Sequence, residues 1–141
     1  MDLVVDPNVI ISATLNVGNS LIIFILNSIT NKFNFIAPEY LIVELSKYTN
    51  ELAERTSFSH EDVTKIISFI INQVTFIPEY KYQDKIEESR VTLKRHEKDI
   101  PYLALALKYN CDILSGDKTF KKFCPDKVRN PKEILNMFYS N

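Results

Sequence analysis

Four carboxylates occupy positions that a parallel α/β sheet would bring to one edge. Asp6 directly follows a predicted strand, and Asp117 lies just beyond another. Glu44 and Asp99 fall in the opening turns of predicted helices that begin at the same edge. Because the functional crevice of an open α/β sheet lies at the carboxyl ends of its strands, we expect these four side chains to converge.

Converging carboxylates repel one another unless a cation lies between them. Oxygen ligands without cysteine or histidine favour Mg²⁺ or Mn²⁺ over zinc. We expect Asp6, Asp99 and Asp117 to hold the ion, with Glu44 nearby. Such a site can activate a water for attack on a phosphodiester and shield the charge that develops on the phosphate.

Each acid also has a purely structural interpretation. Asp6 and Asp99 precede prolines and suit helix caps, and Asp117 suits an ordinary Gly-Asp turn. Glu44 interrupts the apolar run 41–45, where a lone buried charge is costly, although its side chain could lie on the solvated side of the helix. The joint placement of the four acids is more specific than any one of them.

The surrounding pattern alternates strands with helices over the whole chain. We predict strands at 3–5, 33–36, 74–77, 112–114 and 127–128. Helices are predicted at 9–15, 20–31, 38–55, 60–72, 82–94 and 102–109, around Phe120, and at 132–138, with caps at Asn19, Ser59 and Asn130. This alternation predicts one parallel sheet with helices on both faces.

The bulk composition fits a single domain spanning 1–141. Hydrophobic residues make up 45% of the chain and charged residues 25%, and the net charge of -1 argues against coating nucleic acid by charge alone. Cys111 and Cys124 offer neither a disulfide scaffold nor a zinc site; we expect free thiols, with a single bridge as the alternative. No apolar run reaches the ~20 residues of a membrane span, and no basic start suggests a signal peptide. We therefore expect a cytoplasmic protein.

Four segments together resemble the PIN-domain family. They are 5–10, with Asp6 and Asn8; 38–45, with Glu44; 99–107, an Asp and a Pro before a Leu-Ala-Leu-Ala helix; and 113–118, with Asp117. Their order and spacing agree with the family over essentially the whole chain. The resemblance implies a three-layer α/β/α fold with a central parallel sheet.

The resemblance also implies a divalent-metal ribonuclease for single-stranded RNA, with Asp6, Glu44, Asp99 and Asp117 as its acidic site. Asn8 and Ser115 match positions that support the carboxylates by hydrogen bonds. Many members are VapC-like toxins, paired with an antitoxin and often dimeric, whereas others act in RNA processing.

Two departures from the family pattern bear on metal affinity. Pro7 replaces the usual small residue after the first Asp, and Thr119 stands where many members carry a further Asp. The alternative function is therefore a weak or inactive PIN domain that binds protein or RNA. A dehalogenase-like enzyme is disfavoured because Asn8 replaces the required second acid, and no Gly-rich phosphate loop is present.

Basic residues flank two of the acids. They are candidate contacts for RNA phosphates, although a solvated charged face is the simpler interpretation of each; they are Arg95, Lys98, Lys118, Lys121 and Lys122. Four aromatic residues near the site are expected to pack in the core rather than to stack on bases; they are Tyr40, Tyr48, Phe120 and Phe123.

Overall fold

The computed structural model describes residues 1–56 and 58–140 and contains a five-stranded sheet. The strands are β1 (Asp2–Val5), β2 (Asn34–Pro38), β3 (Val74–Ile77), β4 (Asp112–Leu114) and β5 (Val128–Arg129). All pairings are parallel, in the order β3-β2-β1-β4-β5. The predicted parallel α/β architecture is confirmed.

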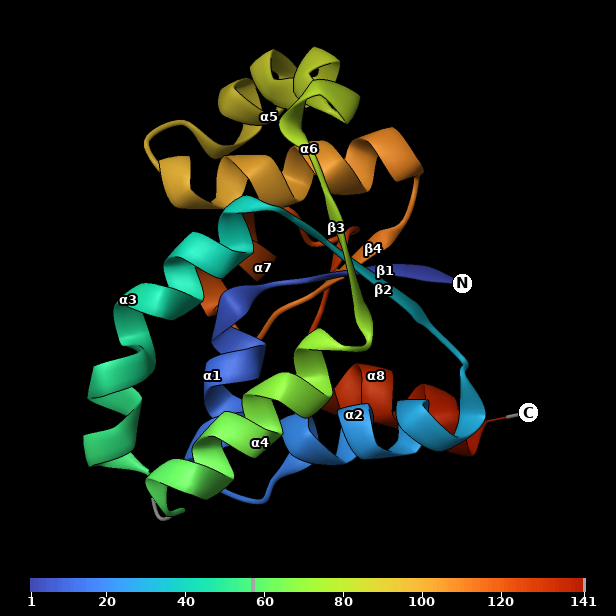
Figure 1. The fold of residues 1–141 in the computed structure, drawn as a ribbon. Helices are drawn as coiled ribbons and strands as arrows, with labels where there is room; N and C mark the ends of the chain where they lie inside the picture. Colours follow the sequence, from blue (N-terminus) through green and yellow to red (C-terminus); the bar gives the residue numbers. More distant parts are fainter. Residues whose placement is uncertain (57, 141) are drawn as a thin grey trace.

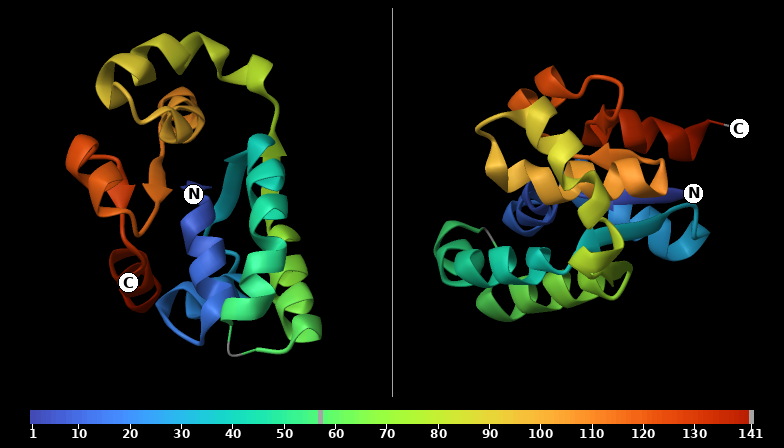
Figure 2. Two further views of the ribbon diagram at one scale, coloured as in Figure 1. Left: turned by 90° about the vertical axis from the view of Figure 1, so that its left-hand side faces the viewer. Right: turned by 90° about the horizontal axis from the view of Figure 1, so that it is seen from above.

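Helices cover both faces of this sheet. Figure 1 shows α5 and α6 on one side and α1, α2, α4 and α8 on the other, and the views in Figure 2 agree. The helices are α1 (Pro7–Leu15), α2 (Asn19–Thr30), α3 (Tyr40–Arg55), α4 (His60–Ile71), α5 (Ile86–Leu93), α6 (Ile100–Tyr109), α7 (Lys118–Phe123) and α8 (Pro131–Tyr139). Over the part of the chain that the structure describes, three 3₁₀ turns complete the path: Glu79–Lys81, Gln83–Lys85 and Glu97–Asp99.

The strands of the sheet centre are apolar because both of their faces are covered. Val4 and Val5 of β1 and Ile113 and Leu114 of β4 are fully buried. The core helix α6 packs on β1, β2 and β4. Its opening residues are therefore held firmly against the end of the sheet at which Asp6 emerges.

The helix boundaries separate correct from incorrect sequence predictions. The Ser59 hydroxyl accepts a hydrogen bond from the Asp62 amide, and the Asn130 side chain accepts one from the Glu133 amide, so both predicted caps are confirmed. The Glu133 side chain also accepts from the Asn130 amide, which completes a capping box. Gly18 rather than Asn19 precedes α2, so the Asn19 cap was wrong.

Two further boundary differences concern the starts of α3 and α5. Pro38 pairs in β2 instead of opening α3, which begins at Tyr40. The helix expected from residue 82 begins at Ile86, because two 3₁₀ turns take up the chain after β3.

Both cysteines are free, Cys124 buried and Cys111 partly so, as expected. Among the described residues, no single helix has the length and hydropathy to cross a membrane. Helices α1 and α2 reach that length and hydropathy only when they are counted as one segment, and the chain bends by 102° between them.

Candidate active site

The topology brings the four acids to the carboxyl edge of the sheet. Asp6 follows β1 and Asp117 follows β4, and these two strands are neighbours. The Asp6 amide continues their pairing by donating to the Leu114 carbonyl oxygen at 3.0 Å. Glu44 comes from the second turn of α3, and Asp99 from the last 3₁₀ turn before α6.

Asp6 is a buried acid, with 5% of its surface exposed. It stands at the N-cap position of α1, yet its carboxylate makes no capping hydrogen bond. Instead its Oδ2 accepts a hydrogen bond from the Ser115 hydroxyl at 2.8 Å. Burial, which is the largest cause, and the charges of Asp99, Glu44 and Asp117 together raise the pKa of Asp6 to about 8, although the Ser115 hydrogen bond lowers it. The capping interpretation of Asp6 does not hold.

Ser115 joins two of the acids through one buried hydroxyl. Besides donating to Asp6, its Oγ accepts from the Asp117 amide at 3.1 Å and from the Asn8 side-chain amide at 3.5 Å. The Asn8 side-chain oxygen accepts in turn from the Gly116 amide at 3.4 Å. A hydroxyl offers one donor and two acceptor lone pairs, so Ser115 uses its full capacity here. Ser115 thus contacts the Asp6 carboxylate directly, whereas Asn8 contacts Ser115 and Gly116.

Glu44 is 8% exposed, so its carboxylate lies inside the protein rather than on the solvated side of α3. The buried Tyr102 hydroxyl donates to its Oε1 at 2.6 Å. Burial raises the pKa of Glu44, while this hydrogen bond and the charges of Lys98 and Lys47 lower it. Sequence reasoning missed Tyr102. The available signal was a tyrosine in an apolar helix, since a buried hydroxyl needs a partner.

Asp99 also makes no capping hydrogen bond. Burial, which is the largest cause, and the charges of Asp117 and Glu44 together raise the pKa of Asp99 to about 6, although His96 and Lys98 lower it. Asp6 and Asp99 therefore lie within electrostatic range of each other and of Glu44 and Asp117.

Asp117 differs from the other three acids because it does cap a helix. Its Oδ1 accepts from the amides of Thr119 at 2.8 Å and Phe120 at 3.2 Å. The structural interpretation from the sequence therefore holds for this residue. Within the described chain, no hydrogen bond to its Oδ2 is found, which leaves that oxygen for another partner. Thr119 contributes only its amide to this cap.

The chemistry of these donors fits a hard divalent cation. All four are carboxylates, and burial together with mutual repulsion raises the pKa of Asp6 and of Asp99. A bound cation would offset both effects. Among residues 1–56 and 58–140, the structure contains no group of three acidic, histidine or cysteine side chains arranged closely enough to hold a metal ion. Mg²⁺ takes only one or two carboxylates directly and keeps several waters; a three-carboxylate ligand set stays a prediction.

A hollow of about 490 Å³ opens beside Asp99 and Asp117. Arg95, His96, Glu97 and Lys98 complete its lining. Exposed lysines 118 and 122 lie on α7, next along the chain from Asp117. Of the predicted phosphate contacts, Arg95 and Lys98 therefore border Asp99 and Asp117, and Lys118 directly follows Asp117 in sequence.

Lys121 differs from these residues because its ammonium group already has two partners within the protein. It donates to the Val128 carbonyl oxygen at 2.6 Å and pairs with Glu133 at 3.3 Å, which ties α7 to β5 and α8. We therefore withdraw Lys121 as an RNA contact.

The four aromatic predictions had different outcomes. Phe120 is fully buried, and Phe123 packs partly buried against His96 with ring centroids 4.9 Å apart. Tyr48 is also partly buried. Tyr40 was wrongly assigned to the core, since 41% of its surface is exposed and it lines a second pocket.

Comparison with known proteins identifies the family of this chain. A search of curated proteins found no match. The family model described as the PIN domain matches residues 4–128, which include all four acids and both supporting residues. PIN domains are in general nucleases, and the family generally uses divalent metal ions. The chain therefore belongs to the PIN domain family.

Proposed function

We propose that this PIN domain is a divalent-metal-dependent endoribonuclease that cleaves single-stranded RNA. The observation that carries the proposal is the buried Asp6 carboxylate, held by Ser115 within electrostatic range of Glu44, Asp99 and Asp117. Burying an acid among other acids is unfavourable for folding. A cation-binding role explains why the fold maintains it.

In this proposal Asp6, Asp99 and Asp117 hold Mg²⁺ or Mn²⁺, which supplies charge neutralisation and water activation when bound. Ser115 fixes Asp6, and Tyr102 fixes Glu44, so both carboxylates are oriented before substrate arrives. Arg95 and Lys98 border the same hollow and would position the RNA backbone by its phosphates.

The test is cleavage of a mixed pool of single-stranded RNA by the purified chain. We expect cleavage with Mg²⁺ or Mn²⁺, none in EDTA, and recovery when either ion is returned in excess. Duplex RNA and single-stranded DNA of the same sequences serve as substrate controls. Cleavage that persists in EDTA would contradict the proposal, because it would need no metal.

We further propose that the protein acts in the cytoplasm, as a homodimeric toxin neutralised by an antitoxin. The support is its membership of a family that includes such toxins. A small open reading frame directly upstream of its gene would be expected. Co-expression of that product should then relieve growth inhibition and co-purify with this chain; an inhibitory chain with no such neighbour would favour RNA processing instead.

The second candidate is a weakly active or inactive PIN domain that binds protein or RNA. One observation favours it: the Asp117 Oδ1 already accepts the hydrogen bonds that cap α7, which leaves only Oδ2 for a metal ion. Thr119, where many members carry an acid, adds no carboxylate. RNA binding that is unchanged by EDTA, without cleavage under any metal, would select this candidate.

Replacing Tyr102 by phenylalanine is expected to lower cleavage about ten- to hundredfold, as for other residues that orient metal-site groups. The change removes the 2.6 Å hydrogen bond from the Tyr102 hydroxyl to Glu44. In the wild-type protein this hydrogen bond lowers the pKa of Glu44. The Glu44 pKa should therefore rise, shifting the acidic limb of the pH–rate profile upward. The same change should destabilise the fold by about 1–3 kcal/mol.

Tyr109→Phe, on the same helix, provides the control for Tyr102→Phe because Tyr109 lies away from the acids at the opposite end of α6. If Tyr102→Phe alters stability but leaves the pH–rate profile where it was, Tyr102 is structural only.

A further inference from the structure

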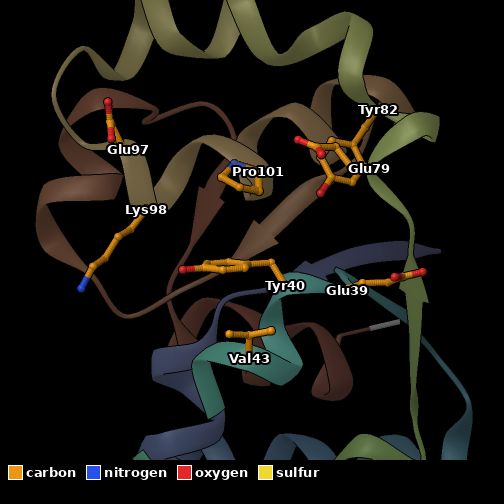
Figure 3. Close-up of a pocket in the computed structure, with 8 residues that line it drawn as sticks. All are labelled: Glu39, Tyr40, Val43, Glu79, Tyr82, Glu97, Lys98 and Pro101. Carbon is orange, nitrogen blue, oxygen red and sulfur yellow. The ribbon is translucent and has the colours of Figure 1, made fainter. Parts of the chain in front are cut away.

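A pocket of about 600 Å³ lies beside the acidic site and adjoins the hollow at Asp117, with which it shares Glu97 and Lys98. It is bounded by α3, the first 3₁₀ turn after β3, and the start of α6; Figure 3 shows its lining residues, Glu39, Tyr40, Val43, Glu79, Tyr82, Glu97, Lys98 and Pro101. Val43 precedes Glu44 in sequence, Lys98 precedes Asp99, and Pro101 lies two positions after Asp99. A nucleotide held at the carboxylates would therefore have this pocket next to it.

The lining combines a flat apolar platform with hydrogen-bond acceptors. Figure 3 shows the Tyr40 ring pointing into the pocket beneath Pro101, with Glu79 and Tyr82 at one end and Lys98 and Glu97 at the other. Tyr40 is 41% exposed, unlike a core aromatic residue. The Lys47 ammonium lies 5.9 Å from the centroid of its ring. An exposed tyrosine beside a nucleic-acid site is the kind of surface on which bases stack.

The charge of the lining indicates what can enter. The lining includes three glutamates and one lysine, so its net charge is negative and the pocket would repel a phosphate. A neutral, flat ring that donates hydrogen bonds suits it better, because ionised carboxylates only accept them. The Tyr82 hydroxyl stays protonated and available as a donor, since burial and then Glu79 and Glu39 raise the pKa of Tyr82 to about 12.

We propose that this pocket is a nucleobase subsite that prefers guanine, with Tyr40 as the stacking platform and Glu79 as the acceptor of the base edge. Guanine presents a ring N–H and an amino group side by side, which two oxygens of one carboxylate can accept. Uracil presents a single N–H between two carbonyl oxygens, which a carboxylate would repel. The inference rests on the proposed function, because it assumes that an RNA phosphate lies at the four carboxylates and that the adjoining base enters this pocket.

Binding of mononucleotides tests the subsite without cleavage. GMP and UMP carry equal phosphate charge, so their difference reports the base alone. We would titrate each into the ¹⁵N-labelled full chain in EDTA and follow amide chemical shifts. GMP should shift signals around residues 40, 79 and 98–100 and should bind at least about fivefold more tightly than UMP, the smaller end of bidentate base discrimination.

Variants assign the two roles separately. Tyr40→Ala should weaken GMP binding at least about fivefold, and Tyr40→Phe should keep it. Glu79→Gln should remove most of the difference between GMP and UMP. Tyr80→Ala is the matched control, because Tyr80 is 69% exposed beside Glu79 and does not line the pocket; it should change nothing.

Three results would overturn the inference: equal affinity for GMP and UMP, equal effects of the alanine changes at Tyr40 and Tyr80, or tighter binding of argininamide than of GMP. The last would indicate that the acidic pocket receives a basic protein segment instead. Because the assay needs neither metal nor cleavage, GMP selectivity in a chain that cuts no RNA would refute only the proposed activity. Cleavage by a chain without that selectivity would refute only the subsite.

Discussion

Replacing Asp6 by asparagine is expected to abolish metal-dependent RNA cleavage, by at least about a thousandfold, while raising the melting temperature. The activity falls because the amide keeps the size of the carboxylate but cannot supply its charge to the cation, and a metal contributes several kcal/mol to charge stabilisation in the transition state. The stability rises because Asp6 is 5% exposed among other acids, whereas a neutral amide pays no comparable desolvation penalty. The amide oxygen can still accept the hydrogen bond from Ser115.

Activity and stability moving in opposite directions is the diagnostic outcome. Both properties are measured on one preparation, by RNA cleavage in Mg²⁺ and by thermal melting in EDTA. Asp126→Asn is the control, since Asp126 is an exposed acid on the turn before β5 and should change neither property. An Asp6→Asn protein that melts lower than wild type and loses activity in proportion would indicate a structural role for the carboxylate.

The metal-free protein is expected to lose stability as the pH rises from 5 to 8. The pKa of Asp6 is raised from 3.8 to about 8, and that of Asp99 from 3.8 to about 6. The folded state therefore binds protons that the unfolded state has released. The stabilisation from these protons is complete below about pH 4 and is lost as the pH rises through the folded pKa values. Each kcal/mol lost should lower the melting temperature by about 3–5 °C for a chain of this size.

Divalent metal should reverse this trend, because it binds the ionised carboxylates. The rise in melting temperature on adding Mg²⁺ should therefore grow from pH 5 to pH 8. Melting curves at four pH values, in EDTA and in Mg²⁺, measure both effects. The Asp6→Asn variant keeps both histidines and should show a flatter pH profile and a smaller Mg²⁺ increment. A metal-free protein that gains stability over this interval would contradict the assignment.

The sequence predicted the fold well because its strongest signals are local. The β-branched run before Asp6 and the Ile-Leu pair before Ser115 became the central neighbours β1 and β4. Parallel pairing then forces Asp6 and Asp117 to the same edge. The boundaries at Asn19 and Pro38 shifted because cap and turn preferences allow a residue or two of adjustment that only tertiary packing settles.

The details of the site needed coordinates because they depend on contacts between distant segments. Tyr102 and Glu44 are 58 positions apart, and no periodicity links them. Lys121 reads as a member of a basic cluster until its contacts with Val128 and Glu133 are seen. Tyr40 reads as a core residue because it opens an apolar helix, yet it lies on the side of α3 that lines a pocket. In all three cases the sequence located the helix correctly, but the contacts of the residue depend on the direction in which its side chain points.

Paramagnetic Mn²⁺ provides the most direct test that the four carboxylates bind a divalent cation. Substoichiometric Mn²⁺, added to the ¹⁵N-labelled chain near pH 7.5, broadens the amide signals closest to the bound ion. We predict that signals around residues 6, 44, 99 and 117 broaden first, that excess Mg²⁺ restores them, and that Asp6→Asn greatly reduces the effect. Broadening centred on the exposed acids of α5, or a pattern unchanged by Asp6→Asn, would contradict the account.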